Sequence, residues 1–271
     1  MRIFKFFLAV LLVLALVAGY ALKIEPYRLK IEEIDLESPF VAEGTKVAIL
    51  TDIHLKEGFD EAQLVKAVKK INEHQPDAVL FLGDLYDNYE TWQGDKEKIK
   101  DAFRGLDADI KLCVYGNHDY GGKAQWAYKE IMEDSGFTIL KNKDFPTDLG
   151  ITFYGADDYI FGERGEGFNF DGNSYGFAMA HVPASVENIE NYDLFAAGHT
   201  HGGQVRLPFI KPFWTPKGTL EYYGGMYENQ DGSMIYISRG MGTSIYTVRF
   251  GAVPEITICK FSKKQLKIER K

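Results

Sequence analysis

The chain has 271 residues, of which 45% are hydrophobic and 26% charged, a composition typical of a globular protein. Lysine and arginine number 31 against 39 aspartate and glutamate residues, so the net charge is −8. With this net negative charge, the chain is not expected to bind nucleic acid through many basic side chains that neutralise its phosphates. We therefore do not expect a nuclease. It is compatible with an anionic substrate, because bound metal ions supply positive charge locally.

The N-terminus is strongly apolar, since residues 6–22 form a run of 17 residues without a charge. As a helix this run is about 25 Å long, close to the ~30 Å hydrocarbon core of a bilayer. We predict that residues 1–22 are a single-pass anchor in the cell membrane, with the N-terminus inside and the domain that follows extracytoplasmic. A cleaved signal peptide is the alternative, because Gly19-Tyr20-Ala21 loosely fits a small-x-small cleavage site.

After this run, residues 23–44 are predicted to be a juxtamembrane segment that contains an edge strand. From residue 46, short apolar runs alternate with amphipathic stretches, a pattern typical of strands joined by helices. Asp60 is a candidate N-cap for the first of these helices. We predict strands at 47–50, 78–82 and 112–115 and helices at 59–74, 96–106 and 123–134.

The second half of the chain changes character, because turns rather than helices separate its apolar runs. We predict strands there at 138–140, 151–154, 175–180, 194–197, 233–237 and 255–261. Together the two halves predict an α/β fold, a four-layer α/β/β/α sandwich of two mixed sheets, as one domain over residues 45–262. Residues 263–271 form a charged tail. Cys113 and Cys259 lie in strand-like runs and are predicted to be buried free thiols.

Five of the six histidines lie in short polar islands that follow the ends of candidate strands. In open α/β sheets, functional groups gather beyond the carboxyl ends of the strands. Asp, His and Asn in such numbers exceed what one metal ion needs and indicate a two-metal hydrolytic site. The islands are Asp52-Ile53-His54, Gly83-Asp84, Gly116-Asn117-His118-Asp119, His181 and Gly198-His199-Thr200-His201.

As a set, these islands resemble the motifs of the calcineurin-like metallophosphoesterase superfamily. The stretches 202–208, 238–244 and 254–256, with Arg249, resemble a narrower branch of bacterial membrane-associated or exported phosphodiesterase-like proteins. The resemblance implies that Asp52, His54 and His201 hold one divalent metal ion. It implies that Asn117, His181 and His199 hold a second ion and that Asp84 bridges the two. Mn, Zn or Fe suit such oxygen and imidazole ligands.

The resemblance also implies a mechanism, in which a metal-bridging hydroxide attacks phosphorus in line. His118 then acts as a general acid that protonates the leaving oxygen, and Asp119 is expected to hold the tautomer of His118. The expected enzyme is a metal-dependent phosphoester hydrolase that favours diesters. The alternative substrate is a membrane-associated, nucleotide-linked lipid precursor with a pyrophosphate link, such as UDP-diacylglucosamine. A rival of another class is a non-catalytic metal- or envelope-binding protein.

Substrate contacts are predicted at Arg206, Arg239 and Arg249, because arginine suits phosphate recognition. Six aromatic residues crowd a loop rich in proline and glycine after the last island: Phe209, Phe213, Trp214, Tyr222, Tyr223 and Tyr227. They indicate either a wall for an apolar part of the substrate, or a contact with the bilayer interface, or residues that pack on the sandwich.

Overall fold

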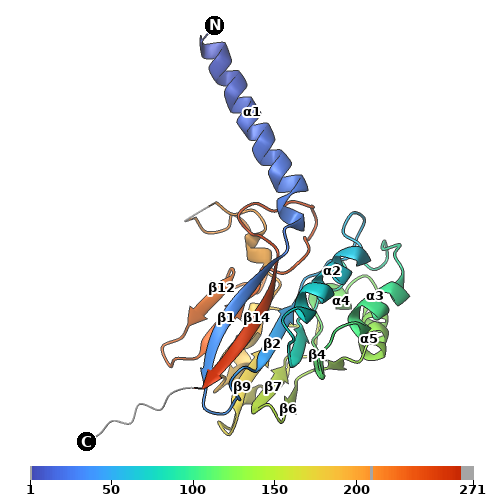
Figure 1. The fold of residues 1–271 in the computed structure, drawn as a ribbon, viewed down its shortest axis with the longest axis vertical. Coiled ribbons are helices and arrows are strands. Elements are labelled where there is room, and N and C mark those ends of the chain that lie inside the picture. Colours follow the sequence, from blue (N-terminus) through green and yellow to red (C-terminus); the bar gives the residue numbers. More distant parts are fainter. Residues whose placement is uncertain (1, 208–209, 264–271) are drawn as a thin grey trace, which may run out of the picture.

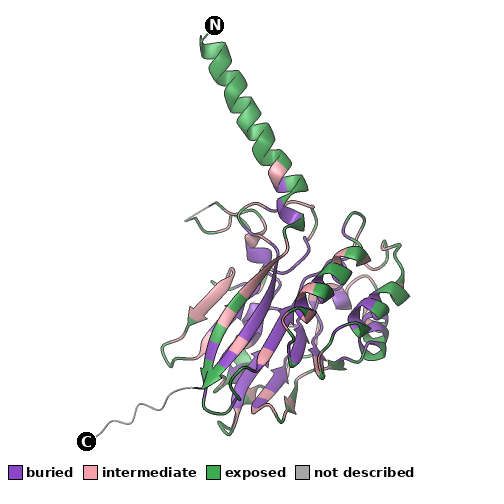
Figure 2. Cartoon of the chain, in the orientation of Figure 1, coloured by how far each residue is buried: buried purple, intermediate pink, exposed green. Residues whose placement is uncertain are grey.

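Two mixed β-sheets pack face to face, and one long helix projects from an end of this sandwich (Figure 1). The computed structural model describes residues 2–207 and 210–263. The projecting helix is α1 (Arg2–Lys23), which is followed by a short 3₁₀ turn, η1 (Glu25–Tyr27). Figure 2 shows that α1 is exposed along almost its whole length and becomes buried only at its foot.

The first sheet has the strand order β1-β14-β2-β3-β4-β5. Its strands are β1 (Lys30–Ser38), β14 (Glu255–Lys263), β2 (Lys46–Leu50), β3 (Ala78–Phe81), β4 (Ile110–Cys113) and β5 (Thr138–Ile139). Its outer face is covered by α2 (Glu61–Asn72), α3 (Lys96–Arg104) and α5 (Gln125–Asp134). Asp60 is the N-cap of α2, because its carboxylate accepts a hydrogen bond from the amide of Ala62 at 3.1 Å.

The alternation along β2 explains why this sheet is buried on both faces. Ala48 and Leu50 face the helical layer, whereas Val47 and Ile49 face the second sheet. Because every second side chain serves a different core, the whole strand reads as one continuous apolar run. The free thiols of Cys113 and Cys259 are buried, as predicted.

The second sheet has the order β12-β13-β11-β9-β7-β6. Its strands are β12 (Gly225–Glu228), β13 (Met234–Ile237), β11 (Leu194–Ala197), β9 (Tyr175–Met179), β7 (Ile151–Gly155) and β6 (Lys143–Pro146). Its outer face is covered by a 3₁₀ helix, η2 (Pro183–Asn188), and by the two-stranded ribbon of β8 (Phe168–Asn169) and β10 (Ile189–Glu190). Within the described ranges this fourth layer holds no α-helix.

The strand directions place α1 and the polar islands at the same end of the sandwich. β1 begins directly after α1 and η1, and β14 runs parallel to β1. β2 is antiparallel to β14, and β3 and β4 are parallel to β2. The carboxyl ends of β2, β3 and β4 therefore lie where α1 joins the domain (Figure 1).

β1 is the edge strand that we expected between residues 23 and 44. It pairs with β14 over its whole length, so the sandwich also includes residues 30–38 of that segment. The edge strands β6 and β12 were not foreseen, because they lack a clear apolar alternation. Of the predicted tail, only Lys263 lies within the described residues.

Candidate metal centre

Two clusters of imidazole and carboxylate groups form where the strands end. Asp52 and His54 follow β2, Asp84 follows β3, His181 follows β9, and His199 and His201 follow β11. In each cluster the potential ligand atoms lie within 4.8 Å of one another. The first cluster is Asp52, His54 and His201, and the second is Asp84, His181 and His199. All six residues are buried.

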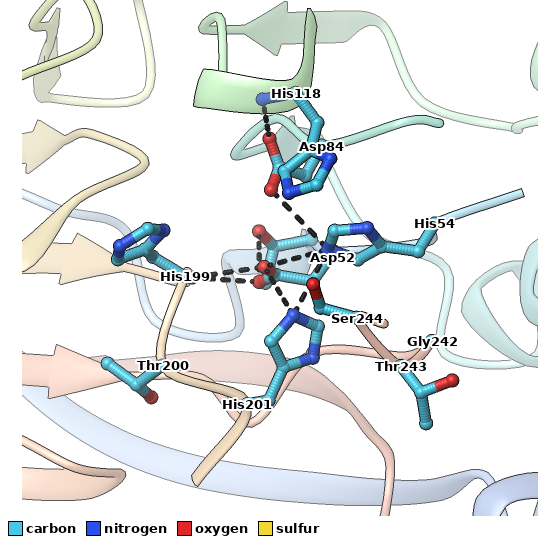
Figure 3. A network of polar contacts seen from close by, with 12 residues as sticks. Asp52, His54, Asp84, His118, His199, Thr200, His201, Gly242, Thr243 and Ser244 are labelled. Carbon is cyan, nitrogen blue, oxygen red and sulfur yellow. Dashed lines mark hydrogen bonds and ion pairs between the residues drawn. The ribbon is translucent and has the colours of Figure 1, made fainter. Parts of the chain in front are cut away.

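Asp84 connects the two clusters. Its Oδ2 atom lies 3.1 Å from Nε2 of His181 in the second cluster and 3.4 Å from Nε2 of His54 in the first. Within the first cluster, Nε2 of His201 lies 3.4 Å from Oδ1 of Asp52 and 3.1 Å from Nε2 of His54. Figure 3 shows the Asp52, Asp84, His54 and His201 side chains turned toward a common centre. One carboxylate oxygen therefore lies close to a histidine of each cluster.

Three of the four rings have one nitrogen that faces an acceptor outside the clusters, whereas Nδ1 of His201 lies 3.3 Å from the Arg249 guanidinium. Nδ1 of His181 lies 2.8 Å from the Leu82 carbonyl, and Nε2 of His199 lies 3.0 Å from the Lys217 carbonyl. Nδ1 of His54 lies 3.3 Å from a carboxylate oxygen of Asp87. Because each held nitrogen faces an acceptor and so carries the hydrogen, the other nitrogen presents a lone pair to the cluster. This is the arrangement that a metal-binding histidine requires.

The backbone is strained at these positions. Five of the residues have a positive φ, namely Asp52 at 53°, His54 at 49°, Asp84 at 59°, His199 at 68° and His201 at 51°. Such conformations cost about 1–3 kcal/mol each for a residue other than glycine. Neighbouring glycines permit the close packing, because a Cβ at Gly198 would lie 2.3 Å from a carboxylate oxygen of Asp52. Strain gathered at one site indicates that the ligand positions serve function rather than stability.

The electrostatics of the clusters favour cations. Burial by itself raises the pKa of Asp52 and of Asp84, but the charges of neighbouring histidines hold the pKa of both carboxyls below the ordinary value. Burial likewise opposes the charged histidines, yet interactions with the nearby carboxylates of Asp52 and Asp87 raise the pKa of His54 to about 9. The charge of Asp84 raises the pKa of His181 to about 10. Two buried carboxylates thus require positive charge nearby, as protons or as metal ions.

Asn117 and His118 begin α4 (Asn117–Tyr120), directly above Asp84. Oδ1 of Asn117 is buried and has no hydrogen-bond partner among the described residues, as expected of an acceptor that serves as a ligand. The amide of His118 donates to Oδ1 of Asp84 at 2.9 Å. Unlike the clustered ligands, the His118 side chain is only partly buried, so a substrate can reach it. Its ring lies edge-on to His54, with the centroids 4.8 Å apart.

Asp119 does not hold His118, contrary to our expectation. Its two carboxylate oxygens accept hydrogen bonds from the amides of Asp84, Leu85 and Gly116 at 2.7, 2.9 and 2.8 Å. The His118 ring is held instead by the main-chain carbonyl of Asp87, which lies 2.5 Å from Nδ1. The reason is helical geometry, since consecutive residues of a helix point in different directions. Asp119 thus fixes the Asp84 loop against α4.

Comparison with known proteins agrees with this geometry. The family model described as calcineurin-like phosphoesterase matches residues 45–203, more than half of the chain. The chain belongs to the calcineurin-like phosphoesterase family. An uncharacterized metallophosphoesterase of Bacillus subtilis (strain 168), YkuE, is 35% identical over 254 residues, which cover 89% of this chain and 88% of that protein. The resemblance read from the islands is therefore confirmed, and so is the two-sheet sandwich.

Two relatives of this calcineurin-like phosphoesterase have more specific names. Phosphodiesterase YaeI of Escherichia coli (strain K12) is 28% identical over 228 residues, which cover 79% of this chain and 80% of that protein. UDP-2,3-diacylglucosamine pyrophosphatase LpxG of Chlamydia muridarum (strain MoPn / Nigg) is 23% identical over 304 residues, covering 89% of this chain and 92% of that protein. The family and the clusters together make this chain a metallophosphoesterase whose Asp and His clusters can bind metal ions.

In this calcineurin-like phosphoesterase, Arg249 is not a substrate contact, contrary to our prediction. Its side chain is fully buried, and its guanidinium donates to main-chain carbonyls. The acceptors include those of Gly242 at 3.0 Å, Arg239 at 2.8 Å and Ala252 at 2.7 Å. Arg249 therefore fixes the position of the loop after β13, next to His201.

The other two predicted arginines differ from Arg249 and from each other. Arg239 is held by the buried carboxylate of Glu255, which accepts from both its amide and its guanidinium. Arg206 is partly buried, and its guanidinium has no hydrogen bond or ion pair with the described residues. Of the three, Arg206 alone keeps a guanidinium that is available to a phosphate.

Replacing Arg249 with methionine is expected to lower the free energy of unfolding by about 3–5 kcal/mol, because several buried carbonyls lose their donor together. Arg206→Met is the matched control and is expected to change the free energy of unfolding by no more than about 0.5 kcal/mol. Urea denaturation followed by circular dichroism measures both variants. Equal stability of the two variants would contradict a structural role for Arg249.

Asp87 is a site residue that the sequence reasoning missed. Its carboxylate lies 3.3 Å from Nδ1 of His54, and its main-chain carbonyl holds the His118 ring. Burial alone would raise the pKa of Asp87, but its interaction with the nearby His54 ring brings it down to about 2. The available signal was its position, since Asp87 follows Asp84 within the same turn after β3. Asp87 thus contacts both His54 of the first cluster and His118, the candidate acid.

Removing the Asp87 carboxylate as Asp87→Ala is expected to weaken metal binding about 10- to 100-fold, because His54 loses the partner that orients it. The main-chain carbonyl that holds His118 remains in this variant. Once metal is supplied in excess, the dependence of kcat on the leaving group should therefore be that of the unchanged protein. Metal titration followed by leaving-group kinetics tests both parts, and an unaltered metal affinity would speak against the role of Asp87.

Proposed function

We propose that this protein is a dinuclear metal-dependent phosphoester hydrolase, with diesters as its favoured substrates. In the proposed centre, Asp52, His54 and His201 hold one divalent ion, whereas Asn117, His181 and His199 hold the other. Asp84 bridges both ions. The observation that carries the proposal is the position of Asp84 Oδ2, within 3.4 Å of a histidine in each cluster. The oxygen and imidazole donors suit Mn, Zn or Fe.

When bound, a pair of divalent ions lowers the pKa of a shared water and stabilises charge on the attacking and leaving oxygens. The protein's own contribution is proton transfer at His118. The Asp87 carbonyl accepts the hydrogen of Nδ1, which leaves Nε2 to carry the mobile proton. In its cationic form the ring donates this proton to the leaving oxygen. The ring is only partly buried beside the first cluster, in agreement with this role.

Support for diesters comes from the relative named phosphodiesterase YaeI. A second candidate is a pyrophosphatase that acts on a nucleotide-linked lipid precursor, and two observations favour it. One relative is named for UDP-2,3-diacylglucosamine pyrophosphatase activity. In addition, α1 is long and apolar enough to cross a membrane, and it joins the domain at the end where the metal clusters lie.

Hydrolysis of matched chromogenic phosphodiesters and phosphomonoesters tests the proposed function. The full chain in detergent is stripped of metal and reconstituted with Mn, Zn, Fe or Mg in turn. Metal-dependent turnover with diesters favoured is the expected result, and faster turnover of a detergent-dispersed lipid pyrophosphate would favour the second candidate. Metal uptake without hydrolysis of any of these substrates would refute the enzyme and indicate a binding protein.

We further propose that α1 remains as an uncleaved membrane anchor, with the catalytic domain on the extracytoplasmic side. The full-length protein is then expected to stay in the membrane fraction after a carbonate wash. A protease added outside intact spheroplasts should digest the domain. Release of a shorter soluble chain would show instead that the segment is a cleaved signal, and complete protection from the protease would reverse the orientation.

A further inference from the structure

Large apolar side chains are exposed around the foot of α1. They belong to residues 205–207 and 210–214, after the last cluster residue His201, and to residues 244–246, after β13. We call residues 205–207 and 210–214 together the first foot loop, and residues 244–246 the second foot loop. The exposed side chains are Leu207, Ile210, Phe213, Trp214, Ile245 and Tyr246, of which Phe213 is 74% and Tyr246 73% exposed. A soluble surface rarely gathers so many, and such a patch marks a contact with another apolar phase.

The two foot loops are joined to each other through Gln204. Its side-chain amide donates to the carbonyls of Ser244 and Tyr246 at 3.3 and 3.1 Å, and its Oε1 accepts from the amide of Ser244 at 2.9 Å. Val205 also forms an isolated β-bridge with Phe250. The apolar side chains of both loops are therefore presented by one connected structure.

The same structure is attached to α1. The amide of Arg249 donates to the carbonyl of Ala21 at 3.0 Å, and the Phe250 ring packs edge-on against Tyr20, with centroids 6.4 Å apart. The carboxylate of Glu25, in η1, accepts from the amide of Ala252 at 2.8 Å. Both loops lie beside the foot of the helix (Figure 1). Because α1 is attached here, its direction fixes which way the foot loops face.

The residues at this foot are of the kind found at membrane–water interfaces. Trp214 and Tyr246 are exposed aromatic residues, and Lys23 and Arg28 are exposed cations just past the apolar helix. Tryptophan and tyrosine concentrate at the headgroup layer, and basic residues near the end of a span bind anionic lipid headgroups. This combination of aromatic and basic side chains favours a lipid surface over a protein partner.

We propose that the foot loops insert into the interfacial layer of the same bilayer leaflet that α1 enters. The partner is the bilayer surface itself, and the inference rests on the proposed membrane anchor. Residues 205–207 and 210–214 lie between His201 and Lys217, whose carbonyl holds the His199 ring. Docking therefore places this end of the sandwich, where the two clusters lie, at the bilayer surface, close to the phosphoester of an amphiphilic substrate.

Tryptophan fluorescence of the full chain in lipid nanodiscs tests this docking. The lipids carry bromine on their acyl chains close to the headgroup, which quenches tryptophans at the interface. Three chains are compared, namely the unchanged protein, Trp214→Phe and Trp126→Phe. Trp126 is the matched control, because it is 78% exposed but lies on α5, in the outer helical layer away from α1.

Docking predicts that the unchanged chain and Trp126→Phe are quenched, and that Trp214→Phe loses most of the quenchable fluorescence. Adding Tyr246→Trp to the Trp214→Phe chain should restore the quenching from the second foot loop. Equal quenching in all chains, or none while the protein is held in the nanodisc, would overturn the docking and indicate that another protein covers this surface.

A chain that elutes apart from the nanodiscs would overturn the docking together with the anchor. Turnover of a soluble diester, measured on the same samples, reports separately on the metal centre. Retained turnover with no quenching refutes docking alone, whereas quenching with no turnover of the soluble diester refutes the proposed diesterase alone.

Discussion

Replacing Asp84 with asparagine is expected to release both metal ions and to reduce turnover at least about a thousandfold, equivalent to ~4 kcal/mol of transition-state stabilisation. The substitution keeps the size of the side chain and removes its charge. Both effects should appear together, because Oδ2 of Asp84 is shared between the clusters. A ligand confined to one cluster would lose one ion and leave the other in place.

The matched control is Asp157→Asn. Asp157 is also buried, but its two oxygens accept from the Tyr120 hydroxyl and the Glu163 amide, and it belongs to neither cluster. This variant should keep its metal. Metal content by mass spectrometry and turnover of a chromogenic diester are measured on both variants. An Asp84→Asn protein with full metal content and ordinary turnover would rule out the bridging role.

Replacing His118 with alanine is expected to leave the metal content near normal and to lower kcat by about 10²- to 10⁴-fold for poor leaving groups. Good leaving groups, which depart without a proton, should be much less affected. The reason is that the ring is held by the Asp87 carbonyl beside the first cluster and is more exposed than the clustered ligands.

The readout for His118→Ala is the slope of log kcat against the pKa of the leaving alcohol, which should become steeper. His74→Ala is the control, because His74 follows α2 and its nearest carboxylate is that of Glu33, at 3.8 Å. An equal loss of rate on good and poor leaving groups would count against general-acid catalysis and leave His118 a role in binding.

Much of the centre could be anticipated from residues such as Asp52, Asp84 and His199, because each follows a short apolar run. Parallel neighbouring strands bring their carboxyl ends to one edge of a sheet, so polar islands at those ends meet in space. This rule needs only the strand pattern, which the apolar runs at 47–50, 78–82 and 194–197 display clearly. The resemblance then supplied the proposed assignment of these residues to each ion.

What could not be predicted depends on side-chain direction and on contacts between distant segments. Asp119 adjoins His118 in the sequence, yet the turn of α4 directs its carboxylate to the Asp84 loop. Arg249 looks like any arginine in a polar loop until the backbone folds around its guanidinium. The contacts of Asp87 with His54 and His118 likewise depend on the folded position of the loop after β3.

Anomalous X-ray diffraction from crystals of the metal-loaded protein, collected at the absorption edge of the added ion, tests the dinuclear centre most directly. We expect two peaks about 3.5–4 Å apart, with the Asp84 carboxylate between them. One peak should lie beside Asp52, His54 and His201. The other should lie beside Asn117, His181 and His199. A single peak at saturating metal, or two peaks without Asp84 between them, would contradict the proposed dinuclear centre.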